Sequence, residues 1–177
     1  VSGEGVASGL LTVLVRNIMA RGFGDATDSA LGEALDAVNR TLARELSASG
    51  STVSCVTFRL GGAGVTYAIA GRSPLFVRRA LGADVEALGG LPGPAETAPL
   101  GRDDFVPSPV ELRLGRGEAL LACSVGLLTG VDAKGEAYGV ERLAQAFRRA
   151  DDDSAESLLT SVMLDFKNSV PRAGRRA

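Results

Sequence analysis

The strongest constraint on the fold lies between residues 52 and 70, where two strand-like segments flank a glycine-rich turn. Residues 52–60 are rich in β-branched side chains and partly alternate, and residues 65–70 repeat this character after Gly61-Gly62-Ala63-Gly64. This pattern predicts a β-hairpin. Helical segments precede and follow the block, and the order of helices, antiparallel strands and helices predicts a layered α+β domain. With no internal repeat or boundary in sight, residues 1–177 are predicted to form one domain.

Amphipathic segments on both sides of this block predict helices. Residues 9–20 carry dense apolar side chains up to Gly22, and Asp28 is the predicted N-cap of a second helix. The apolar residues of that second helix recur every three or four positions, at Leu31, Leu35, Val38, Leu42 and Leu46. Gly139 opens a third helix, and Ser154 is the predicted cap of a fourth. Their predicted apolar faces consist of Val140, Leu143, Ala144, Phe147, Leu158, Leu159, Val162, Met163 and Phe166.

Further strands are predicted with glycine-rich connections. Residues 75–80 are predicted to form a strand. Residues 82–109 are rich in Gly and Pro and are predicted to form a long surface loop. Residues 110–114 and 118–123 flank Gly115-Arg116-Gly117 as a second predicted hairpin. The last of these strands then runs into a predicted tight glycine turn at Ser124-Val125-Gly126.

Composition excludes several kinds of chemistry. The 177 residues contain no histidine, which rules out Ser-His-Asp and Cys-His catalysis and the usual zinc sites. A net charge of −2 gives no electrostatic basis for binding nucleic acid, and the basic residues of 172–176 are too few to change this. Cys55 and Cys123 lie among apolar neighbours, so we expect both to be reduced and buried in one β core rather than paired or redox-active.

The apolar run of residues 6–15 has the alternative interpretation of a signal segment. Glu4 rather than a basic residue precedes it, however, and Arg16 ends it well short of a membrane span. We therefore expect a cytoplasmic protein without a membrane partner. Because the chain starts with Val1 rather than Met, we also expect it to be a segment or a processed form.

Six short motifs occur in order between residues 1 and 143. They are Val1 to Leu11, Asn39 to Leu42, Ala70 to Pro74, Pro99 to Gly101, Gly115 to Leu121, and Ser124 to Gly126 with the Gly-x-x-Tyr-Gly-x-x-x-Leu of 135–143. Together they resemble the metal-dependent (PPM-type) bacterial protein serine/threonine phosphatases of the SpoIIE/RsbU class. Glu4 and Arg72 stand where the family pattern has His, and Val125 stands where it has Asp. The resemblance implies a PPM-phosphatase-like α-β-β-α sandwich with antiparallel sheets, whose first strands would precede Val1.

The resemblance also implies a cofactor. In this family two Mg²⁺ or Mn²⁺ ions, held by Asp carboxylates, clamp the phosphate and activate a bridging water. The first such Asp would precede Val1, whose backbone carbonyl would also face a metal, and the second position is Val125. The third, in an Asp-Asp-x-Thr strand, has no counterpart in residues 168–177. We therefore expect impaired hydrolysis, with either a weakly held metal or none.

The implied cleft brings together residues far apart in sequence. Its candidates are Ser2, Gly3, Glu4, Arg72, Ser124, Val125 and Gly126. Arg72 is interpreted either as a phosphate contact or as a surface arginine at a strand end, and Glu4 as a cation ligand or a solvated carboxylate. Asp103-Asp104 and residues 151–153 are interpreted as solvated turn carboxylates rather than substitute ligands.

Three functions remain open at this point. The first is a working phosphatase domain of bacterial signalling, of the sigma-factor partner-switching type, whose missing ligands lie outside residues 1–177 and whose site tolerates Val125. The interpretation that we favour is such a phosphatase domain with impaired catalysis. The second is a non-catalytic pseudophosphatase that binds or regulates a phosphoserine protein such as an anti-sigma-factor antagonist. The third is a structural module of a sensor protein. A homodimer and a fusion to a sensor domain are both compatible with the sequence.

Overall fold

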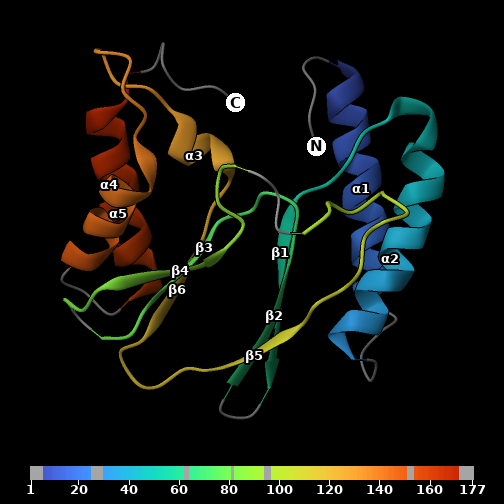
Figure 1. Ribbon diagram of the computed structural model, residues 1–177, viewed down its shortest axis with the longest axis horizontal. Coiled ribbons are helices and arrows are strands. Elements are labelled where there is room, and N and C mark those ends of the chain that lie inside the picture. The colour runs from blue at the N-terminus through green and yellow to red at the C-terminus, as the bar shows by residue number, and fades with distance from the viewer. Residues whose placement is uncertain are drawn as a thin grey trace. The chain divides into compact units, whose positions relative to one another are not determined.

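A computed structural model of the chain describes residues 6–24, 30–61, 64–80, 82–93, 97–150 and 154–171. Its contacts divide the chain into two compact units, each considered by itself: unit 1 is Val1–Ser73 with Pro94–Arg113, and unit 2 is Pro74–Gly93 with Leu114–Ala177. Helices and antiparallel strands occur in both (Figure 1), which confirms the predicted α+β class. That residues 1–177 form one domain stays a prediction.

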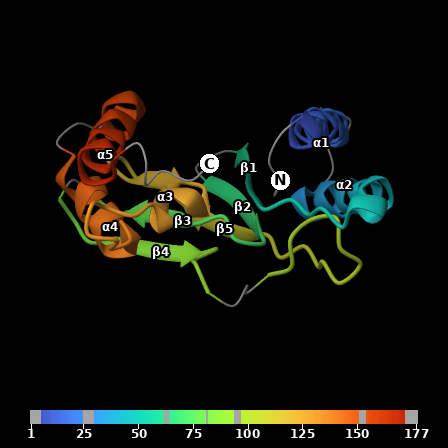
Figure 2. The same cartoon turned by 90° about the horizontal axis from the view of Figure 1, so that it is seen from above.

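Two helices lie side by side in unit 1 (Figure 1 and Figure 2). α1 spans Val6–Gly24, longer than predicted, and α2 spans Leu31–Leu46, followed by the short 3-10 helix η1 at Ser47–Ser49. The five apolar residues predicted for α2 are all buried, because their spacing places them on one face. The N-cap of α2 is Ala30, which makes no side-chain cap bond, so the predicted cap was wrong; Asp28 itself lies outside the described residues.

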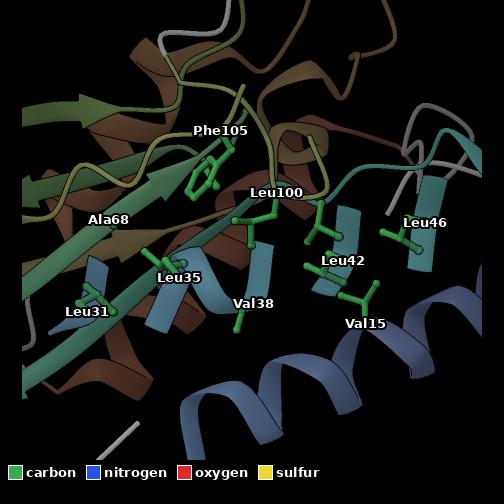
Figure 3. Close-up of a cluster of buried hydrophobic side chains, with 11 residues drawn as sticks. Val15, Leu31, Leu35, Val38, Leu42, Leu46, Ala68, Leu100 and Phe105 are labelled. Carbon is green, nitrogen blue, oxygen red and sulfur yellow. The ribbon is translucent and has the colours of Figure 1, made fainter. Parts of the chain in front are cut away.

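The core of unit 1 is built around α2. Figure 3 shows the apolar side chains of α2 between Val15 of α1 and two residues of the later loop, Leu100 and Phe105. Leu42 and Leu100 have no exposed surface, and Phe105 is 6% exposed. Burial of a side chain of this size contributes roughly 1.5–3 kcal/mol. The prediction of a surface loop over residues 82–109 was therefore wrong: Leu100 and Phe105 enter the core from irregular backbone, and Val85–Gly89 forms a strand.

One three-stranded sheet belongs to unit 1, in the order β1-β2-β5. β1 (Cys55–Gly61) and β2 (Gly64–Ala70) form the predicted antiparallel hairpin. β5 (Val110–Arg113) pairs antiparallel with the other edge of β2 and aligns Val110 with Tyr67.

Unit 2 contains the second sheet, in the order β4-β3-β6. β3 (Leu75–Arg78) lies between β4 (Val85–Gly89) and β6 (Ala119–Ala122), antiparallel to both. The predicted second hairpin was thus wrong: β5 and β6 follow each other in sequence but pair with different central strands. The Gly-Arg-Gly turn still folds back locally, because the Gly115 N–H donates to a carboxylate oxygen of Glu118 at 2.7 Å.

Three helices complete unit 2: α3 (Val125–Thr129), α4 (Gly139–Arg149) and α5 (Ala155–Ser169). α4 packs against β3 and β4, and α5 packs against α4 (Figure 2). Ser154 caps α5 as predicted, since its hydroxyl accepts a bond from the Ser157 N–H at 3.2 Å. Most of the predicted apolar positions are buried or half-buried, but Leu159 is 55% exposed and was wrongly placed in the core.

A buried arginine fixes the end of α4. Arg78 has no exposed surface, and its Nη1 donates to the carbonyls of Phe147 (3.0 Å) and Ala150 (2.8 Å). Its guanidinium also lies 5.3 Å from the centroid of the Phe147 ring. A cation placed at the last carbonyls of a helix is favourable, so Arg78 ties β3 to the C-terminus of α4.

The two cysteines are free thiols, as predicted, but they do not share one core. Cys55 opens β1 and packs against the apolar cluster of unit 1, whereas Cys123 follows β6 and packs against the cluster of unit 2. Both are half-buried rather than fully buried. Desolvation raises the pKa of each thiol to about 11.

Candidate functional site

The turn after β2 carries Arg72, the candidate phosphate contact. The preceding Gly71 has a φ of +63°, and its N–H donates to the Ala98 carbonyl at 3.1 Å. A Cβ at Gly71 would lie 2.4 Å from Ser54 Oγ and 3.0 Å from the Pro99 Cβ, so only glycine fits without displacement. The Arg72 N–H donates to Ser54 Oγ at 3.1 Å, while the arginine side chain is exposed. The backbone of Arg72 is thus fixed and its guanidinium faces solvent.

The loop over residues 98–102 is held against this turn and against α2. Val53 and Leu100 exchange two backbone hydrogen bonds, each of 2.9 Å. Asn39 of α2, only 5% exposed, accepts a bond from the Gly101 N–H at 2.7 Å and donates to the Arg102 carbonyl at 2.9 Å. Three motifs that carry the sequence resemblance, at Asn39, Gly71 and Pro99 to Gly101, therefore form one contact network.

Sequence reasoning had not found Ser54 or the function of Asn39 within this network. The position of Asn39 could have indicated a structural function. A short polar side chain inside an amphipathic helix destabilises the helix by competing for backbone bonds, so it needs a hydrogen-bond partner elsewhere. Ser54 gave none, since a serine in a strand-like segment is ordinary.

The other described candidate residues lie in unit 2, where β6 ends. The Cys123 N–H donates to the Pro74 carbonyl at 3.0 Å, and Ser124 is the exposed N-cap of α3. Val125 and Gly126 are the first residues of that helix, so the predicted tight glycine turn was wrong. Gly126 does not have the positive φ that such a turn requires. In this strand-to-helix junction Cys123 and Ser124 separate the end of β6 from Val125, which is half-buried.

The Asp132 carboxylate adds side-chain bonds to the backbone bonds that hold the connection from α3 to α4. Asp132 Oδ1 accepts bonds from the N–H groups of Lys134 (2.8 Å) and Glu136 (3.0 Å), and Arg142 lies 3.4 Å from Oδ2. The backbone bonds, chiefly that from Glu136, lower the pKa of Asp132 below its ordinary value. Because both carboxylate oxygens of Asp132 are bonded to groups of this chain, Asp132 holds the loop in place and is not a candidate metal ligand.

Tyr138 closes the same loop onto α5. Its hydroxyl donates to Asp165 Oδ2 at 2.6 Å, and its ring meets Phe166 edge-on with centroids 5.2 Å apart. Burial, together with the bond to the Asp165 carboxylate, raises the tyrosine pKa well above its ordinary range. The hydroxyl of Tyr138 thus adds a charge-assisted bond to the apolar packing of its ring.

The remaining sequence candidates have different outcomes. Val1, Ser2, Gly3 and Glu4 lie outside the described residues, as do residues 151–153. Asp103 and Asp104 are exposed, and Asp104 forms a bidentate ion pair with Arg102 at 2.7 and 2.9 Å, in agreement with the interpretation as solvated turn residues. The Arg72 turn and the Ser124–Gly126 junction belong to different units, so their convergence with residues 1–5 stays a prediction.

The donor atoms at the β6 end do not fit a hard divalent cation. Val125 offers no oxygen from its side chain, and the neighbouring side chains are the Cys123 thiol and the Ser124 hydroxyl. Mg²⁺ and Mn²⁺ require oxygen ligands, mostly carboxylates. Within the described ranges, no group of three or more Cys, Asp or Glu side chains is placed to hold a metal. None of the helices described is both long and apolar enough to span a bilayer.

The fold and this arrangement define a class of protein. The chain superposes on the SiaA-PP2C domain of Pseudomonas aeruginosa with a TM-score of 0.82 at 18% identity, covering 99% of this chain and 68% of that one. It matches the structure of the RsbU and RsbW domains of a Mycobacterium tuberculosis protein with a TM-score of 0.71 at 20% identity, covering 96% and 46%. The catalytic domain of the serine/threonine protein phosphatase PstP, solved with 2 manganese ions, gives a TM-score of 0.64 at 15% identity, covering 89% and 76%.

At these identities the likeness shows the fold, which is that of the PP2C-type phosphatase domains. A family model described as Stage II sporulation protein E (SpoIIE) matches residues 1–176. The chain therefore belongs to the SpoIIE family, as the resemblance of its motifs had predicted. No curated protein sequence matches the chain significantly.

Proposed function

We propose that this chain is a regulatory phosphatase-family domain of bacterial signalling that recognises a phosphoserine protein and hydrolyses it poorly. The client has the chemistry of an anti-sigma-factor antagonist: a small protein with one phosphorylatable serine. Family membership supports the phosphatase ancestry, and the fold likeness to the RsbU domain agrees with a partner-switching setting. A cytoplasmic location, and assembly as a homodimer or as part of a sensor protein, belong to the same proposal.

The observation that carries impaired hydrolysis is Val125. It is the first residue of α3, two residues beyond the end of β6 at Ala122, at the position where the family pattern has a metal-binding Asp. Replacing a carboxylate by an isopropyl group removes one charge and one inner-shell oxygen from the implied site. Because two metal ions would stabilise the charge on the transferring phosphoryl group, weaker metal binding lowers the hydrolysis rate directly.

Recognition of phosphate can persist without the metal. The Arg72 guanidinium is exposed on a fixed backbone, and a guanidinium pairs with two phosphate oxygens at once. The alternative function, a non-catalytic binding or regulatory module, differs from the first only in having no hydrolysis at all.

The test of the metal position is Val125→Asp. In the 177-residue chain we expect no Mn²⁺-dependent hydrolysis of a phosphoserine peptide before or after the substitution, because the resemblance places the bridging Asp before Val1. In a longer form of the polypeptide with Asp immediately before Val1, the substitution should raise Mn²⁺ affinity more than about tenfold, or about 1.4 kcal/mol. Thr129→Asp, which adds the same charge one helical turn further along α3, is the matched control.

Titration calorimetry with Mn²⁺ measures both variants. Equal affinity with Val and Asp at position 125 would show that this residue does not face a metal. For recognition, Arg72→Ala should weaken binding of a phosphoserine peptide, whereas Arg113→Ala, another exposed arginine of unit 1, should not. Equal binding by wild type and Arg72→Ala would contradict the proposed phosphate contact.

A further inference from the structure

The side chain of Asn39 is a buried polar group whose bonds all leave its own helix. Its carbonyl oxygen accepts from the Gly101 N–H and its amide donates to the Arg102 carbonyl, more than sixty residues away in sequence. Asparagine is a poor helix former, and a buried amide is stable only when both ends are paired. Asn39 therefore does little for α2 itself and specifically binds the loop of residues 98–102.

That loop in turn determines the geometry of the Arg72 turn. Pro99 precedes Leu100, which forms the bridge with Val53, and Pro99 lies against Gly71. The Ala98 carbonyl accepts a bond from the Gly71 N–H at 3.1 Å. The space around Gly71 is filled, since even one added carbon would meet Pro99 backbone and side chain at 3.2 and 3.0 Å. A displaced loop would therefore displace Gly71 as well.

The other side of the turn is fixed by the neighbour of Val53. Ser54 Oγ accepts the Arg72 N–H, and the same oxygen lies next to Gly71. Val53, the neighbour of Ser54, exchanges two backbone bonds with Leu100 and so connects Ser54 to the loop. The chain of contacts is thus closed: α2 holds the loop through Asn39, and the loop with Ser54 holds the backbone of Arg72.

We infer that Asn39 is a positioning residue for Arg72, which sets where the arginine presents its guanidinium to a phosphorylated ligand. The ligand part of this inference rests on the proposed function; the positioning part does not. Arg72 has no described side-chain anchor of its own, so the direction of its side chain depends on its main chain. A buried residue of α2, without contact to the ligand, then controls affinity for it.

Amide hydrogen exchange, resolved by residue with NMR on the ligand-free chain, tests the positioning part. Asn39→Ala should accelerate exchange at Gly71, Arg72 and Gly101 by about tenfold or more relative to the β1–β2 hairpin amides. Thr41→Ala, which removes a hydroxyl bonded only within α2 to the Ala37 carbonyl, should leave all these rates unchanged. Uniform acceleration across unit 1 after Asn39→Ala would overturn the inference, because it indicates loss of general stability.

A second variant covers the case in which Asn39→Ala does not fold. Ser54→Ala should accelerate exchange at Arg72 while Gly101 stays protected, because Asn39 still holds the loop. Unchanged exchange at Arg72 after Ser54→Ala would also overturn the inference.

Binding of a phosphoserine peptide separates the two proposals. If Arg72→Ala weakens binding, Asn39→Ala should raise the Kd at least about fivefold under conditions where the variant is fully folded. Unchanged affinity in Asn39→Ala alone would refute the positioning of the ligand contact. If Arg72→Ala leaves binding intact, the proposed phosphate contact fails, and the exchange pattern still decides whether Asn39 fixes the turn.

Discussion

Replacing Gly71 by alanine tests the tightness of the network around Arg72. Two costs add at this position. The first is conformational, because a φ of +63° lies in the left-handed region, which costs an L-residue with a side chain about 1–2 kcal/mol. The second is steric, because the new Cβ would meet Ser54 Oγ at 2.4 Å and the Pro99 Cα and Cβ at 3.2 and 3.0 Å. Overpacking of this kind costs roughly 1–3 kcal/mol.

Gly50 separates these two costs. It has nearly the same backbone conformation, with a φ of +61°, and belongs to the same unit, but a Cβ there would meet nothing within 4 Å. Gly50→Ala should therefore lower the free energy of unfolding by the conformational cost alone, about 1–2 kcal/mol. Gly71→Ala should lower it by about 2–5 kcal/mol, the sum of both costs.

Urea unfolding followed by far-UV circular dichroism measures both variants against the parent chain. The decisive quantity is the difference between the two substitutions, in which the conformational cost cancels. Equal destabilisation by the two alanines would refute the reasoning, since it would mean that Ser54 and Pro99 yield to the new methyl group without cost. An unaffected Gly71→Ala would show that the turn itself is not formed as described.

Three further predictions concern unit 2 and the thiols. Tyr138→Phe removes the charge-assisted bond to Asp165 but keeps the ring, and should lower the free energy of unfolding by about 1.5–3 kcal/mol, measured by urea titration. Asp132 has a folded-state pKa below its ordinary 3.8, so its contribution is present above that value and disappears as pH falls through the folded pKa. The stability gap between wild type and Asp132→Asn should therefore close in acid; a gap that widens there would contradict the sign. The pKa of each thiol, Cys55 and Cys123, lies near 11 rather than 9.0. Both thiols should therefore react with iodoacetamide at pH 8 about tenfold more slowly in the native than in the denatured chain. Equal rates would exclude the desolvation.

Local sequence signals predicted those elements whose partners are close in sequence. The α2 pattern and the hairpin of β1 and β2 are specified by spacing and by one glycine-rich turn, and both were correct. The error at β5 and β6 has a different origin. Each has the pattern of a strand, but the choice of partner depends on long-range packing, and β2 and β3 each offer an edge to one of them. A Gly-Arg-Gly turn reverses the chain whether or not its flanking strands pair with each other.

The same distinction applies to the loop before β5. Its Gly and Pro content predicted irregular backbone correctly for residues 97–109, but not its burial. Leu100 can enter the core because its own backbone groups bond to Val53 and the neighbouring Gly101 N–H bonds to the Asn39 side chain. Polar satisfaction by distant residues cannot be read from periodicity, which reports only which face of an element is apolar.

Two groups of sequence positions have different physical functions. Asn39, Gly71 and Pro99 belong to the motifs that carry the family resemblance, and Val125 is the residue on which the proposal of impaired hydrolysis rests. The Asn39 side chain bonds to the backbone of Gly101 and Arg102, the Gly71 N–H donates to the Ala98 carbonyl, and Pro99 packs against Gly71, so all these contacts lie within unit 1. Val125 follows β6 as part of a correctly formed helix, so the scaffold there does not depend on a carboxylate. A carboxylate at position 125 is thus not required for the fold, whereas Asn39 and Gly71 take part in the contacts of unit 1. The network that holds the Arg72 backbone consists of unit 1 residues, so under the proposed function the presentation of Arg72 does not require hydrolysis.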